Sequence, residues 1–94
     1  MKSQLTPAHE LLLYLDGVDS WWPDSGETYL MLGAREYLHA HRAELSLEQL
    51  LELRFADARL LQLDNEAADV VTRDRIDLRR IAEFVRRPDV ARAA

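Results

Sequence analysis

The sequence predicts an all-α fold, a single domain built as a compact bundle or array of about four helices. Apolar residues recur at helical spacing along most of the chain. Glycine and proline number only three each, too few for a turn-rich β fold, and no pair of segments has strand character. With 94 residues, 48% of them hydrophobic and 31% charged, the composition fits one soluble globular domain. No apolar stretch approaches the roughly 20 residues that a membrane span needs.

The first predicted helix covers residues 6–16. Thr6 is a good N-cap, and Pro7 suits the first helical position because its missing N–H would have no intrahelical partner there. The pair Asp16-Gly17 is expected to end this helix.

The longest predicted loop, residues 17–26, carries the adjacent pair Trp21 and Trp22. Tryptophan is frequent in binding hot spots, whereas large aromatic side chains are usually well buried. We therefore expect Trp21 and Trp22 to form a protein-binding site, with one of them anchoring the loop in the core and the other partly exposed.

A second helix is predicted over residues 26–43. Asp24 or Ser25 is the expected N-cap. The helix is amphipathic, and Arg35 falls largely opposite its apolar face.

The third predicted helix, residues 46–65, has the clearest start: Ser46 and Gln49 form the pattern of a capping box. It carries two apolar stripes on roughly opposite sides, Leu47, Leu50, Leu51, Ala58 and Leu61 against Leu53, Ala56, Leu60 and Leu63. A helix with two apolar faces is expected to pack against other elements on both faces. Either this helix is central in the domain, which we expect, or one stripe meets a second copy in a homodimer.

The fourth helix is predicted over residues 77–87, with Asp77 as N-cap and Pro88 as its end. Residues 88–94 are expected to form a frayed tail, and the β-branched stretch at 70–72 is interpreted as a connector or helix end.

Charge is unevenly distributed along the chain. The net charge is −5, which disfavours nucleic acid and anionic lipid as partners. Residues 1–72 hold 13 acids and 5 bases, whereas residues 73–94 hold 7 arginines and 4 acids. Within the fourth helix a stripe of arginines is expected to bind an acidic protein surface, or else nucleic acid, through guanidinium groups. The stripe consists of Arg79, Arg80, Arg86 and Arg87.

Catalytic and metal-binding patterns are weak. The chain has no cysteine, and no serine lies in a glycine-flanked nucleophile elbow. His39 and His41 point to different sides of a helix and cannot share a metal ion. Asp16 to Glu27 spans an EF-hand-like frame, but Val18 stands at the third position, which needs an oxygen ligand, and Trp21 stands at the sixth, which needs glycine. We expect no cofactor, no metal site and no enzymatic activity.

These patterns favour a non-enzymatic protein–protein interaction module: an adaptor, a chaperone-like partner or a regulator of another protein. The alternative is a nucleic-acid-associated regulator that uses the arginine-rich C-terminal helix, and a small enzyme or metal-binding protein is a third reading. The expected location is the cytoplasm, with no membrane partner. Eleven of the 12 bases are arginine, which suggests a GC-rich bacterial genome.

Overall fold

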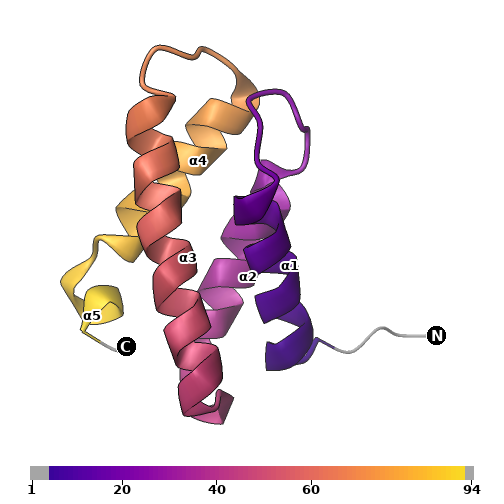
Figure 1. Cartoon of the computed structure of the whole chain (residues 1–94), viewed down its shortest axis with the longest axis vertical. Helices are drawn as coiled ribbons and strands as arrows, with labels where there is room; N and C mark the ends of the chain where they lie inside the picture. The colour runs from indigo at the N-terminus through magenta and orange to yellow at the C-terminus, as the bar shows by residue number, and fades with distance from the viewer. Residues whose placement is uncertain (1–4, 93–94) are drawn as a thin grey trace.

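The structure, a computed structural model, describes residues 5–92 and confirms the all-α fold (Figure 1). Its four main helices are α1 (Pro7–Asp19), α2 (Thr28–Ala40), α3 (Leu47–Glu66) and α4 (Arg73–Val85). A 3-10 turn, η1 (Arg42–Glu44), joins α2 to α3, and a short helix, α5 (Pro88–Ala91), follows α4. None of these helices is both long and apolar enough to cross a bilayer.

Successive main helices run in opposite directions (Figure 1). They form a ring around one core in the order α1, α2, α4, α3. Helix α1 packs against α2 and α3, and α4 packs against the same two helices. The core between them is apolar, and its fully buried side chains include Tyr14, Leu38, Leu60, Leu78 and Ile81.

A largely buried ion pair joins α2 to α3. Arg35, which we expected on the outer face of α2, is only 2% exposed. Its Nε and Nη2 donate to the two carboxylate oxygens of Asp57 in α3, at 2.9 and 2.8 Å. The Tyr14 hydroxyl donates to the same carboxylate at 2.7 Å, and burial, together with the Asp57 charge, raises the pKa of Tyr14. The expectation for Arg35 was wrong because a carboxylate from another helix compensates its charge.

Helix α1 begins as predicted but ends later. The Thr6 side chain accepts a hydrogen bond from the His9 amide, which confirms the N-cap. The helix then continues through Gly17 to Asp19. A Cβ atom on Gly17 would lie only 2.6 Å from Met31 Cγ, so this glycine permits close packing of α1 on α2 and does not end the helix.

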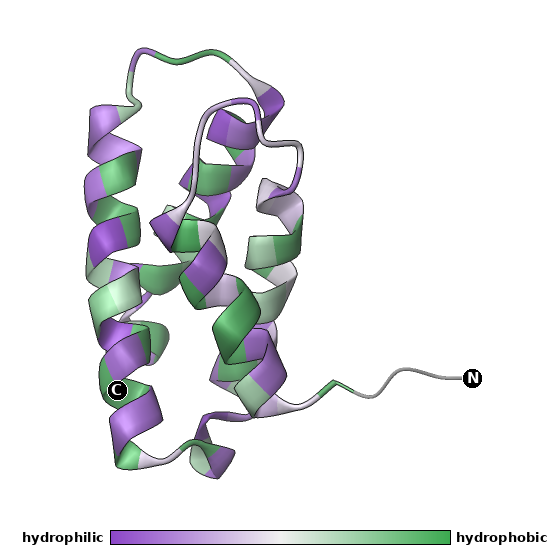
Figure 2. Ribbon diagram, turned by 45° about the vertical axis from the view of Figure 1, so that its right-hand side comes forward, coloured by the Kyte–Doolittle hydropathy of each residue, from purple (hydrophilic) through white to green (hydrophobic). Residues whose placement is uncertain are grey.

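Helix α3 buries one apolar stripe. The capping box of Ser46 and Gln49 is present. The stripe containing Leu53 and Leu60 is buried, whereas Leu47 on the other stripe is 75% exposed. Figure 2 shows apolar and polar residues alternating around this helix. The prediction of a central helix was therefore wrong, because α3 is one of four helices in the ring.

Helix α4 begins earlier than predicted, with its N-cap five residues before Asp77. Thr72 is its N-cap and accepts a hydrogen bond from the Arg75 amide. Asp77, the predicted cap, lies inside the helix and is 4% exposed. Both residue types are good caps, so local preference does not distinguish them.

The segment after α4 is not frayed where the structure describes it. Residues 88–91 form α5, and Val90 is 2% exposed. The prediction of a tail was wrong for these residues because a single apolar side chain anchors the turn to the bundle; residues 93 and 94 lie outside the described part.

Candidate functional site

The loop between α1 and α2 separates the two tryptophans. Trp21 is half-buried against the core, and its Nε1 donates to Thr28 Oγ1 at 2.9 Å. Trp22 is 56% exposed. One side chain therefore anchors the loop and the other faces solvent, the division expected for the pair.

A carboxylate from α4 holds this loop in place. Asp74, 4% exposed, accepts hydrogen bonds from the Gly26 amide at 2.9 Å and the Thr28 amide at 3.2 Å. It also accepts from the Thr28 hydroxyl at 2.7 Å and the Ser25 hydroxyl at 3.3 Å. The start of α2 is thus capped from another helix, and the expected capping by Asp24 or Ser25 was wrong. Gly26 adopts a φ of +78°, a conformation that glycine tolerates best.

The electrostatics of Asp74 fit this role. Burial alone would raise the pKa of its carboxyl, but the hydrogen bonds from Thr28, Gly26 and Ser25 outweigh burial and hold the pKa below its usual range. The Thr72 hydroxyl adds a further tie by donating to the Pro23 carbonyl at 2.6 Å. The loop that carries Trp22 is therefore fixed at both its middle and its end.

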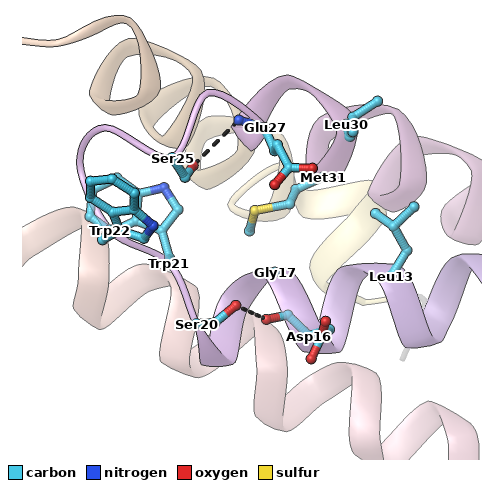
Figure 3. A pocket seen from close by; sticks show the side chains of 10 residues that line it. All are labelled: Leu13, Asp16, Gly17, Ser20, Trp21, Trp22, Ser25, Glu27, Leu30 and Met31. Carbon is cyan, nitrogen blue, oxygen red and sulfur yellow. Dashed lines mark hydrogen bonds between the residues drawn. The ribbon is translucent and has the colours of Figure 1, made fainter.

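A pocket of about 230 Å³ opens between this loop, α1 and the start of α2 (Figure 3). The two indoles lie at one end and Leu13 and Leu30 lie at the other, with Met31 above Gly17 between them. Polar groups on the walls are contributed by Asp16, Ser20, Ser25 and Glu27. The site combines aromatic and aliphatic surface with two carboxylates, Asp16 and Glu27, for which the sequence indicated no partner-binding role.

The predicted arginine stripe is largely engaged with carboxylates of the chain itself. Arg79 and Arg86 reach Asp64 of α3 at 3.0 and 3.3 Å, and the buried Arg75 reaches it at 2.7 Å. Asp64 is 1% exposed. Burial would raise the pKa of Asp64, but its hydrogen bonds and charge interactions with Arg79 and Arg75 lower it.

The other two arginines of the stripe also lie near carboxylates. Arg80 is 3.7 Å from Asp77, and Arg87 is 2.9 Å from Asp89. The four residues do not form one free basic face, because each has an acidic neighbour. Sequence reasoning missed Asp64 and Asp74, whose partners are distant in the chain and leave no local signal.

Residues 5–92, the part of the chain that the structure describes, contain no group of three His, Cys, Asp or Glu side chains placed to hold a metal ion. His41 stacks on Tyr37 with ring centroids 3.9 Å apart, and His39 lies 3.7 Å from Asp89. Compared with known protein families, with curated proteins and with solved structures, the chain shows no significant match.

Proposed function

We propose that this chain is a non-enzymatic protein–protein interaction module that contacts its partner through Trp22 and the adjacent pocket. The observation that carries the proposal is an exposed indole on a loop already fixed by Asp74 and Thr72. Tryptophan supplies large contact area in binding hot spots. A loop held in its binding geometry loses little conformational entropy when the partner arrives.

Affinity capture with matched variants tests this function. Tagged wild type, Trp22→Ala and Tyr29→Ala are incubated with nuclease-treated host lysate, and captured proteins are quantified by mass spectrometry. Tyr29 is 60% exposed and does not line the pocket, so it controls for the loss of any exposed aromatic. The protein captured by wild type is then purified, and its Kd is measured with all three chains.

Trp22→Ala is expected to weaken binding at least about ten-fold, the effect of a hot-spot residue, while Tyr29→Ala binds like wild type. Equal Kd values for wild type and Trp22→Ala would contradict the proposal. The urea midpoint of Trp22→Ala is measured alongside to show that the loop and bundle remain folded.

The α4 side adds a surface suited to an acidic partner region. Three arginines surround the carboxylate of Asp64, and Glu83 lies near Arg79, so the positive charges outnumber the negative ones by one; Arg79 and Arg86 are about half exposed. Nucleic acid is the alternative occupant of this surface. A steep loss of affinity for DNA or RNA with added salt would favour it, whereas absence of binding at low salt would remove it.

A second copy of the chain fits the exposed side of α3. Leu47, Leu51 and Phe55 repeat every four residues along one face and are 75%, 46% and 75% exposed. A symmetric pairing of two α3 helices would cover this apolar row in both copies.

Light scattering across a concentration series tests the homodimer. A dimer mass for wild type and a monomer mass for Phe55→Glu are expected, because the variant buries a charge in the interface. A monomer mass for wild type at millimolar concentration would refute this arrangement. The cytoplasmic location is likewise part of the proposal, and fractionation of host cells measures it.

A further inference from the structure

We infer that the pocket beside Trp22 binds a basic side chain, arginine or lysine, presented by an exposed segment of the partner protein. The inference rests on the proposed function, because Trp22, which carries that function, lines this pocket. The proposed function names only a partner protein, whereas the pocket indicates which side chain of that partner is bound.

Size limits what the pocket can hold. Its volume of about 230 Å³ lies below the roughly 300–1,000 Å³ of pockets that enclose whole small molecules. A volume of this size suits a single side chain. Leu13, Leu30 and Met31 provide aliphatic wall for a methylene stem, since long basic side chains pack their stems on apolar surface while the charged head stays polar.

The charged head would meet two kinds of attractive group. The face of an indole attracts a cation, and the exposed Trp22 lies at one end of the pocket (Figure 3). Asp16 on α1 and Glu27 at the head of α2 bring carboxylates from opposite walls. A guanidinium group can bond such carboxylates with two parallel N–H donors.

The surrounding charge favours a basic ligand over an apolar or acidic one. Residues 3–34 contain five acids and no lysine or arginine. Within residues 5–92, neither Asp16 nor Glu27 takes part in an ion pair. An apolar side chain would remove water from both carboxylates without replacing it, which is unfavourable. An acidic side chain would be repelled by the carboxylates of Asp16 and Glu27.

Short peptides provide the direct test. The probes are acetylated and amidated Gly-Gly-X-Gly-Gly peptides in which X is arginine, lysine, citrulline or leucine. Citrulline is the matched control, because it keeps the shape of arginine and lacks the charge. Binding is followed by NMR through the indole N–H signals of the two tryptophans, which Trp22→Phe assigns.

The arginine and lysine peptides are expected to shift the Trp22 signal saturably, with a Kd in the millimolar range appropriate to a single side chain. The citrulline peptide should bind about ten-fold more weakly than the arginine peptide. The Trp22→Ala variant should bind the arginine peptide about five- to thirty-fold more weakly than wild type does. Raising the salt concentration should weaken binding by the charged peptides only.

Variants of the carboxylates complete the test. The double variant Asp16→Asn/Glu27→Gln should lose about ten-fold in affinity for the arginine peptide. Asp24→Asn removes an exposed acid of the same loop that does not line the pocket, and its affinity should stay within about two-fold of wild type.

The outcomes separate this inference from the proposed function. Equal binding of citrulline and arginine peptides, preference for leucine, or no saturable shift would overturn the basic ligand, even if capture of the partner still depends on Trp22. Conversely, charge-dependent peptide binding together with a partner that ignores Trp22→Ala would support the pocket chemistry and overturn the proposed function.

Discussion

Replacing Asp74 with alanine is expected to lower the free energy of unfolding by about 3 kcal/mol. The carboxylate accepts hydrogen bonds from Thr28 N and Thr28 Oγ1, and Thr28 is fully buried. Each buried donor left without an acceptor costs about 1–3 kcal/mol. Gly26 and Ser25 are more exposed, so water can replace the acceptor for them at little cost. For a domain of this size the loss corresponds to roughly 12–24 °C in Tm.

The assay is urea unfolding followed by far-UV circular dichroism, with Asp74→Asn as the near-isosteric control. The carboxyl pKa is lower in the folded state, so the charge stabilises the fold above the unfolded pKa of about 3.9. This contribution is lost as pH falls through the folded pKa. The stability gap between wild type and Asp74→Asn should therefore narrow below about pH 4.

Two results would refute this reasoning. One is a change of less than about 0.5 kcal/mol for Asp74→Ala, the size of an ordinary surface substitution. The other is a gap between wild type and Asp74→Asn that stays constant as the pH is lowered, since the charge would then contribute nothing.

Three further substitutions probe other contacts by the same urea assay. Gly17→Ala should destabilise by about 1–3 kcal/mol through the clash with Met31, although alanine favours helix by about 1 kcal/mol; a more stable variant would contradict the close packing. Asp64→Ala should cost about 3–5 kcal/mol because it leaves the buried Arg75 charge without a carboxylate, although two backbone carbonyls still accept from this guanidinium; an effect under 1 kcal/mol would rule out a compensating role. Val90→Ala should cost about 1–2 kcal/mol, whereas an unchanged midpoint would mean that α5 adds no stability.

Local signals predicted most of the fold. The caps at Thr6 and Ser46 and the apolar periodicity located the first three helices to within a few residues. The predictions that were wrong concern residues whose structure depends on a contact with a residue distant in the sequence. Gly17 remains helical because Met31 lies against it, and Arg35 is buried because Asp57 faces it from α3.

The candidate site was predictable only in part. Two tryptophans on one loop, one anchored and one exposed, follow from the opposing tendencies of that residue. The role of Asp74 could not be predicted, because no spacing rule links it to Gly26 and Thr28. The arginine stripe was visible as periodicity, but its pairing with Asp64 depends on how α3 and α4 cross.

The contacts of Asp74 also impose an order on the appearance of the interaction loop during synthesis. Asp74 lies 46 to 49 residues after the loop groups that it holds. At typical elongation rates of about 5–20 residues per second, a ribosome needs roughly 2–10 s to add that length. During this interval α1 and α2 exist in the nascent chain without the carboxylate that fixes the turn at Gly26. Display of Trp22 in its final geometry therefore requires a chain translated at least through α4, and a truncated product lacks it.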